Sequence, residues 1–278
     1  MTAVALALAA SLTWGFSDFG AGLAARRVSV FLVAAGAQVA GLALVGTIVL
    51  AAGQPVPSAR QLAWAAFGGV AGILGLSCFY RALAVGTMGI VGPITATGAI
   101  VPVVYGVARG ERPDALQAGG IALAVVGVVA ASLEPLPEGG RRVGAGVGLA
   151  LAAALSFGCS LVGLGRAAPG GVVWGTLTMR MAAVPLVLAL VLVTRPALPA
   201  AARGWAWLAA VGLADTGATL LYGEASTHGL LSVVAVLASL YPIVIVVLAR
   251  VVLSERVAHA QLAGVGVALA GVALISAG

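Results

Sequence analysis

Charged side chains are scarce in this sequence, and lysine is absent altogether. Only 8% of the 278 residues are charged, whereas 62% are hydrophobic, and a soluble domain carries about 25% charged residues. Such a chain cannot cover a folded surface with polar groups, so we expect the lipid bilayer to be its solvent. All 14 basic residues are arginines. Most of them lie between apolar segments, which is typical of loops at a membrane surface rather than of a nucleic-acid-binding patch.

Cysteine and histidine are also rare. Cys78 and Cys159 both lie within apolar segments, which favours buried reduced thiols over a disulfide framework. Neither histidine is expected deep in the membrane, and the sequence has no GxSxG motif, no paired metal ligands and no phosphate loop. We therefore expect no enzyme, no cofactor and no bound metal. The first apolar segment lacks a basic start and continues past Asp18, so we expect a retained helix rather than a cleaved signal peptide.

Long apolar segments make up most of the chain. A helix that crosses a bilayer needs about 20 mostly apolar residues, and ten segments between glycine, proline or arginine clusters fit that length. The expected helices cover residues 2–25, 30–51, 62–83, 88–108 and 115–133, then 144–166, 172–193, 204–225, 230–252 and 258–276. The sequence thus predicts an all-α polytopic, multi-pass protein with ten transmembrane helices, located in a plasma membrane or bacterial inner membrane.

The two halves of the chain resemble each other. LTWGFS at Leu12 recurs as LSFGCS at Leu155, and ERPDALQAGG at Glu111 recurs as ERVAHAQLAG at Glu255. The spacings are 143 and 144 residues. The chain is therefore interpreted as two copies of one five-helix unit, separated by the longest predicted connection.

We place the first repeat at residues 1–138 and the second at residues 139–278. An odd number of membrane crossings puts the second copy in the inverted orientation. Inverted repeats are common in transporters, whose substrate site lies at the repeat interface near the middle of the bilayer. The pattern favours alternating access around a central cavity over a channel, while a flippase for lipid headgroups remains compatible with it.

Both halves also carry short motifs of a known family. The residues concerned are Leu240-Tyr241-Pro242, Ser254-Glu255-Arg256, Gln261 and Gly264 in the second half, and Trp14-Gly15, Gly92-Pro93, Pro102, Gly110-Glu111-Arg112, Gln117 and Gly120 in the first. With them the chain resembles the EamA-type transporters of the drug/metabolite transporter superfamily over essentially its whole length. The resemblance implies a ten-helix basket with a central cavity and alternating access. Relatives include exporters of amino acids, metabolites and cationic drugs, and carriers of nucleotide sugars and sugar phosphates.

Two residues of opposite charge, Arg180 and Asp215, lie inside predicted membrane helices. Counted from the opposite ends of antiparallel neighbours, they come at similar depths. One buried charge alone would carry a large penalty, so we expect the two to pair or to share a network. Two roles stay open: a structural ion pair, or a site at which Arg180 contacts a substrate carboxylate or changes partner during transport.

Asp18 is a further charge in a predicted membrane helix, about 10 Å from the helix end at 1.5 Å per residue. Trp14 shares its helix face. An aromatic ring beside a carboxylate suits a cationic or amino-group ligand, and a carboxylate away from water can take part in proton coupling. The repeat-equivalent residue is Leu161, so the repeated fold does not demand the carboxylate. The alternative is a solvated residue near the membrane interface.

Softer polar groups complete the candidate lining of the cavity, although serine and threonine in membrane helices often bond only to the preceding turn. Glu224, Tyr222 and His228 are expected to cluster near the end of the eighth helix. Glu111 and Glu255 are expected to serve as surface or capping residues. The candidate substrate-binding or coupling residues are Trp14, Ser17, Asp18, Tyr80, Thr95, Thr97, Ser156, Ser160, Arg180, Asp215, Tyr222, Glu224, Ser239 and Tyr241. Prolines at 93, 102, 185 and 242 are expected to kink helices, above all the fourth and ninth.

Together these features predict a secondary transporter for a small polar metabolite such as an amino acid or amine, moving it outward by proton coupling or exchange. The expected partners are that substrate, the lipid bilayer and protons, but no nucleic acid, and the expected assembly is a monomer or loose dimer. The orientation stays open. Nine arginines follow the odd-numbered helices and four follow helices 2, 4 and 6, which places both termini outside by the positive-inside rule. The family resemblance instead implies cytoplasmic termini.

Overall fold

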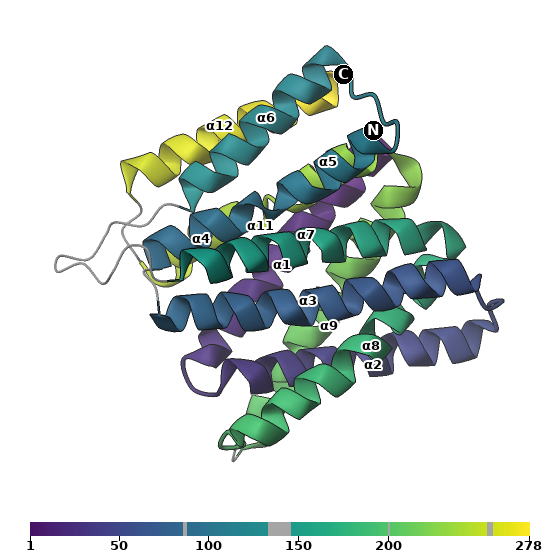
Figure 1. Cartoon of the computed structure of the whole chain (residues 1–278). Helices are drawn as coiled ribbons and strands as arrows, with labels where there is room; N and C mark the ends of the chain where they lie inside the picture. Colours follow the sequence, from purple (N-terminus) through teal and green to yellow (C-terminus); the bar gives the residue numbers. More distant parts are fainter. Residues whose placement is uncertain (86–87, 133–145, 200, 255–257) are drawn as a thin grey trace.

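The computed structural model describes residues 1–85, 88–132, 146–199, 201–254 and 258–278. Within these ranges every regular element is a helix (Figure 1). The elements are α1 (Thr2–Ala25), α2 (Val30–Ala52), α3 (Ala59–Val85), α4 (Met88–Ala96), the 3-10 turn η1 (Thr97–Ala99), α5 (Ile100–Ala108), α6 (Ala115–Ala131), α7 (Val147–Ala167), the 3-10 turn η2 (Ala168–Gly170), α8 (Val172–Thr194), α9 (Ala202–His228), α10 (Leu231–Ala238), α11 (Tyr241–Val252) and α12 (His259–Ala277). The longest predicted connection, residues 134–142, lies entirely outside the described residues.

Seven helical segments of the described chain are long and apolar enough to cross a membrane. They are Thr2–Ala25, Val30–Ala52, Ala59–Val85, Val147–Gly170, Val172–Thr194, Leu231–Val252 and His259–Ala277. Two further apolar segments, Ile94–Ala108 and Ala115–Ala131, are shorter. The remaining long helix, α9, carries Arg203, Asp215 and Glu224. The chain is therefore an all-helical polytopic membrane protein, and ten crossings stay a prediction.

The fourth and ninth predicted helices are each interrupted. The fourth is divided into α4 and α5 by the turn at Thr97–Ala99, and the ninth into α10 and α11 at Ser239–Leu240. Pro242 lies in the first turn of α11, where the missing N–H of proline leaves no hydrogen bond unmade. Pro185 lies inside α8, which continues through it. The side chain of Pro93 is outside the described part.

The first helix of each half packs on the third helix of the other half. α1 packs on α9, and α7 packs on α3. In the first contact Ser17 Oγ donates to the carbonyl of Val211 at 3.0 Å, and in the second Ser160 Oγ donates to the carbonyl of Gly68 at 2.8 Å. The two donors are 143 residues apart, and so are the two acceptors. The same interhelical hydrogen bond is therefore made twice, once in each copy.

The last helices of the two halves, α6 and α12, lie side by side at one edge of the bundle (Figure 1). A Cβ added to Gly127 of α6 would overlap the backbone of Ala268 on α12. A Cβ added to Gly264 of α12 would likewise overlap the backbone at Ala131. Small residues let membrane helices approach this closely, because apolar attraction gives no advantage over contact with lipid.

The family motifs at the helix ends act as caps. Gln117 N donates to Asp114 Oδ1 at 2.8 Å, while the Gln117 side chain accepts from the backbone N–H of Asp114, which forms a capping box at the start of α6. The Glu111 carboxylate accepts the backbone N–H groups of Leu231 at 2.9 Å and of Ser232 at 3.0 Å. Glu111 therefore caps the start of α10 in the other half, which agrees with the expected capping role. Its counterpart at position 255 lies outside the described residues.

Candidate functional site

Arg180 on α8 and Asp215 on α9 form an ion pair inside the bundle. Arg180 Nη2 lies 2.6 Å from Asp215 Oδ2, and the Arg180 side chain is only 3% exposed. The pairing predicted from the depths of the two residues is thus confirmed. Since an unpaired buried guanidinium is strongly unfavourable, each residue makes the other tolerable within the bilayer.

Two residues that the sequence analysis missed also hold Arg180. Nη1 donates to Gln38 Oε1 at 2.7 Å, and Nη2 donates to Thr219 Oγ1 at 3.2 Å. Gly41, one turn from Gln38 on α2, provides the space, because a Cβ there would lie 3.2 Å from Arg180 Nε. Gln38 is the single amide side chain in the apolar helix α2, and that isolation was a usable signal for a buried polar contact.

The other oxygen of the Asp215 carboxylate is held by α1. Trp14 Nε1 donates to Asp215 Oδ1 at 3.1 Å, and the Trp14 ring contacts the ring of Tyr222 with centroids 5.7 Å apart. Tyr222 is completely buried, and its hydroxyl donates to the carbonyl of Leu161 at 3.1 Å. Asp215 is therefore anchored from α1 and α8 at once.

Asp18 lies beside this network without a polar partner of its own. It is partly exposed, and no hydrogen bond or ion pair joins it to the residues that the structure describes. Its charge interacts with that of Asp215, and it acts electrostatically on the phenol groups of Tyr80 and Tyr241. The fold thus gathers Trp14 and these four residues from α1, α3, α9 and α11.

The cluster contains two carboxylates but one guanidinium. Arg180 balances Asp215, so the charge of Asp18 has no counterpart among the described residues. An ionised side chain at membrane depth normally faces a partner or a functional pathway. A proton or a positively charged group of a ligand could supply the balance.

The polar cluster lies at the contact of α1 with α9, and the repeat-equivalent contact of α7 with α3 is apolar at the corresponding positions. Phe157 and Phe79 are the repeat equivalents of Trp14 and Tyr222, and their rings are also in contact, with centroids 6.4 Å apart. The equivalent of Asp18 is a leucine. The same helix contact therefore exists in an apolar form, so packing alone does not require the polar side chains.

Other candidates lie outside the cluster. Glu224 is exposed and contacts His228 at 3.1 Å, whereas Tyr222 is buried on another face of α9, so the expected grouping of Tyr222 with Glu224 is wrong. Ser17 and Ser160 join helices, as described above. The hydroxyls of Thr95, Thr97 and Ser239 donate to carbonyls three or four residues earlier, and Ser156 is partly buried with no hydrogen bond in the described part.

Comparison with known proteins identifies the family. The EamA-like transporter family model matches residues 1–133 and 144–277. The chain belongs to the EamA-like transporter family. It is therefore a membrane transporter of the drug/metabolite transporter superfamily, in agreement with the motif resemblance.

The fold of this EamA-like protein is also found among solved structures. One of them, described only as "Crystal structure of protein", is similar with a TM-score of 0.81 and 20% sequence identity, over 98% of this chain and 95% of that chain. At this identity the likeness shows the fold alone. No curated protein matches the chain.

Proposed function

We propose that this EamA-like protein is a secondary transporter that exports a small polar metabolite with an amino group, such as an amino acid or a related amine. The observation that carries the proposal is the unbalanced carboxylate of Asp18 beside an aromatic ring and a neutralised ion pair. Coupling to protons or exchange of one solute for another fits the same carboxylate.

Alternating access between two inverted five-helix repeats is the proposed mechanism. Three observations support it. The family model matches two successive segments. The helix contacts of the first half have counterparts in the second, including α1 on α9 with α7 on α3, and α1 on α11 with α7 on α5. The serine hydrogen bonds of Ser17 and Ser160 are equivalent as well.

The proposed roles follow from the charges. Asp18 binds the ammonium group of the substrate or a proton, and Trp14 offers its ring face to the same cation. Arg180 holds Asp215 in the empty state and can turn toward a substrate carboxylate when one arrives. A zwitterionic amino acid matches both halves of this cluster, because it carries one charge of each sign.

The excess of carboxylates argues against the other substrates that this fold could take. A nucleotide sugar or sugar phosphate would bring further negative charge to a cluster in which one carboxylate is already unbalanced. A lipid headgroup with an amine would be compatible with it. Flipping of such a lipid is the second function that the transport assay must separate from solute export.

The test is flux through purified protein in liposomes. Radiolabelled amino acids, small amines and neutral sugars are compared under an imposed pH gradient, together with a fluorescent aminophospholipid in the same vesicles. We expect amino-group solutes to move and sugars not to move. Movement of sugars would overturn the proposal, and movement of the lipid alone would assign the flippase function instead.

A further inference from the structure

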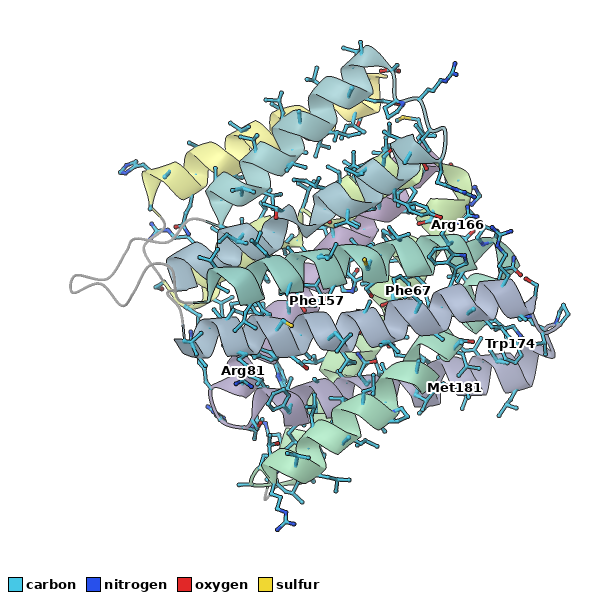
Figure 2. The ribbon with its side chains drawn as sticks, in the orientation of Figure 1. Phe67, Arg81, Phe157, Arg166, Trp174 and Met181 are labelled. Carbon is cyan, nitrogen blue, oxygen red and sulfur yellow. The ribbon has the colours of Figure 1, made fainter. Side chains whose placement is uncertain are left out.

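A cavity at one end of the bundle is lined by hydrogen-bond donors and by no carboxylate. Its volume is about 410 Å³, and it lies between the beginning of α3 and the end of α7. The lining residues are Ser58, Arg60, Gln61, Trp64, Arg166 and Pro169. Figure 2 places Arg166 at the same end of the bundle as Trp174, and Arg81 at the opposite end. The cavity is therefore at a membrane face and away from the Asp18 cluster.

Several hydrogen-bond donors of this cavity have no acceptor in the described part of the protein. Arg166 Nε is buried without a hydrogen-bond partner in the described part of the chain. Gln61 Oε1 already accepts from Ser58 N at 3.1 Å and from Ser58 Oγ at 2.8 Å, which leaves the amide N–H groups of Gln61 to offer. Arg60 is exposed and forms no ion pair with a described residue. Because guanidinium groups only donate hydrogen bonds, the cavity is chemically suited to an anion.

Comparison with the other repeat shows that this arrangement is specific to one side. Trp207 is the repeat equivalent of Trp64, and its Nε1 donates to the carbonyl of Gly20 at 3.0 Å. Trp64 makes no such bond among the described residues, so its indole N–H is available in the cavity. The equivalent of Arg166 is Leu23. Arg60 has a counterpart in Arg203, but the other copy has no equivalent of Arg166 and uses its tryptophan N–H within the protein.

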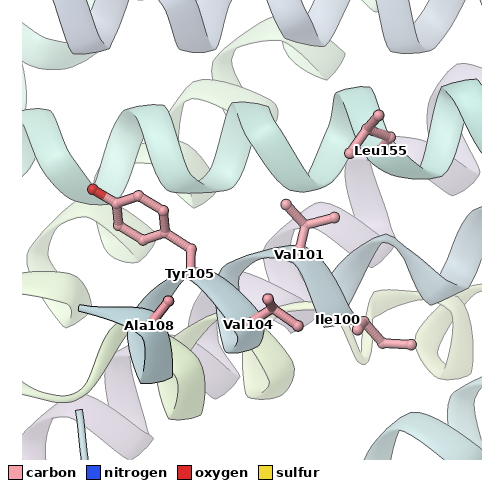
Figure 3. A pocket seen from close by; sticks show the side chains of 6 residues that line it. All are labelled: Ile100, Val101, Val104, Tyr105, Ala108 and Leu155. Carbon is pink, nitrogen blue, oxygen red and sulfur yellow. The ribbon is translucent and has the colours of Figure 1, made fainter. Parts of the chain in front are cut away.

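An apolar groove adjoins the cavity. Its volume is about 460 Å³, and it runs along α5 beside α7, lined by Ile100, Val101, Val104, Tyr105, Ala108 and Leu155 (Figure 3). Val104 is 61% exposed and Leu155 is 58% exposed, so the groove opens on the outer surface of the bundle. The rings of Tyr105 and Trp64 are in contact, with centroids 6.0 Å apart. The groove and the donor-lined cavity therefore meet at these two rings.

We propose that the cavity and the groove together bind one anionic phospholipid. Its phosphate sits between Arg60 and Arg166, and one acyl chain lies in the groove along α5. Charge complementarity selects the headgroup, because the cavity presents two cations and no acid. Trp64 and Tyr105 lie where the two parts meet, as aromatic residues do at the level of lipid headgroups. Basic pockets between membrane helices bind phospholipid headgroups elsewhere for the same reason.

The test is native mass spectrometry of the purified protein titrated with phosphatidylglycerol. Diacylglycerol with the same chains and inorganic phosphate are the two comparison ligands. We expect Arg166→Gln and Arg60→Gln each to weaken phosphatidylglycerol binding about tenfold, since each removes a charge-assisted hydrogen bond. The matched control is Arg112→Gln, which removes an exposed arginine in the α5–α6 connection and should bind as the wild type does. Val104→Trp, which fills the groove, should weaken binding of phosphatidylglycerol about tenfold as well.

Three results would overturn the proposal. Equal binding of phosphatidylglycerol by the wild type, Arg60→Gln and Arg166→Gln would show that the arginines do not hold the phosphate. Equal competition by diacylglycerol would show that no headgroup is recognised. Displacement by inorganic phosphate together with normal binding by Val104→Trp would assign the cavity to a free anion. If Arg166→Gln does not fold, binding by Arg60→Gln still distinguishes these outcomes, because Arg60 is exposed and its substitution should not affect folding.

Discussion

Asp18 and Asp215 lie near each other but are held in opposite ways. Both oxygens of Asp215 accept hydrogen bonds, one from Arg180 and one from Trp14. Asp18 accepts none from the described residues. An anchored carboxylate is satisfied by the protein itself, whereas a free one at membrane depth needs a ligand or a proton. Different substitutions therefore test the two residues.

Substitution Asp18→Asn should leave insertion and folding intact, because the side chain keeps its size and loses no hydrogen bond to the described residues. We expect it to abolish transport, or to remove the dependence of transport on pH between about pH 5 and pH 8, where a carboxylate at membrane depth can exchange protons. Flux in liposomes at several pH values measures both effects. Glu224→Gln is the matched control, since Glu224 is exposed at the end of α9. Normal transport by Asp18→Asn at every pH would make Asp18 an interfacial residue.

The Arg180–Asp215 pair should behave as a unit. Arg180→Gln or Asp215→Asn alone leaves an uncompensated buried charge, which costs about 3 to 5 kcal/mol of unfolding free energy. The double substitution removes both charges and should cost clearly less than the sum of the two. Denaturant unfolding in mixed micelles provides the comparison. A double variant that loses as much stability as the two single variants together would contradict coupling between the two side chains.

The sequence predicted this ion pair but not its whole surroundings. Counting depth along apolar helices was enough to match Arg180 with Asp215. Gln38 could not be matched in the same way, because its contact depends on how closely α2 approaches α8 and α9. That approach is set by Gly41, where a side chain would collide with Arg180 and with the Thr216 hydroxyl. Packing distances of this kind have no periodic signal in a chain that is apolar almost everywhere.

At the scale of helices, the lengths of the apolar segments predicted where the helices begin and end. They predicted only in part where the fourth and ninth predicted helices are broken. α8 was predicted at 172–193 and is observed at Val172–Thr194. The interruption in the fourth predicted helix lies at Gly98, where a Cβ would come within 2.7 Å of the carbonyl oxygen of Ala154 on α7. Gly98 and α7 are distant in sequence, so their close contact cannot be read from one helix alone. The prolines of the fourth helix indicated that it is distorted, but they did not indicate that the break lies at Gly98.

The contact between α6 and α12 should be sensitive to single methyl groups. Gly127→Ala would place a Cβ against the backbone of Ala268, so we expect a loss of about 1 to 3 kcal/mol in unfolding free energy, as for other overpacked sites. Gly119→Ala on the same helix meets nothing within 4 Å and should be neutral or slightly stabilising, because alanine favours helix. Thermal unfolding of the two variants in one detergent gives the comparison. Equal behaviour would mean that the two helices do not pack as closely as described.

The paired serines offer a test of equivalence between helix contacts. Ser17→Ala and Ser160→Ala each remove one interhelical hydrogen bond, and each should lower the unfolding free energy by about 0.5 to 1.5 kcal/mol. We expect similar losses, because donor and acceptor occupy equivalent positions in both copies. Chemical denaturation monitored by tryptophan fluorescence measures them. If only Ser17→Ala also reduced transport at unchanged stability, Ser17 would belong to the substrate site.

At the scale of the whole molecule, the repeat predicts topology. The α2–α3 and α8–α9 connections are repeat equivalents, so inverted halves place them on opposite sides of the membrane. Gln54→Cys and Ala197→Cys, each introduced after Cys78 and Cys159 are replaced by alanine, should react with an impermeant thiol reagent from opposite sides. Labelling of oriented vesicles measures this. Reaction from the same side would exclude the inverted arrangement, and the identity of the reactive side would settle the orientation of the termini.

Because α1 packs on α9 of the other half, the first helix of the chain is synthesised long before the helix that it contacts. Trp14 and Ser17 bind partners that lie 201 and 194 residues further along the chain. At about 5 to 20 residues per second, α1 waits on the order of 10 to 40 seconds before α9 exists. Throughout that time the Trp14 indole N–H and the Ser17 hydroxyl lack the acceptors that α9 provides in the finished fold. We therefore expect a chain that ends before α9 to keep these two donors without acceptors in the bilayer, where an unsatisfied polar group costs several kcal/mol.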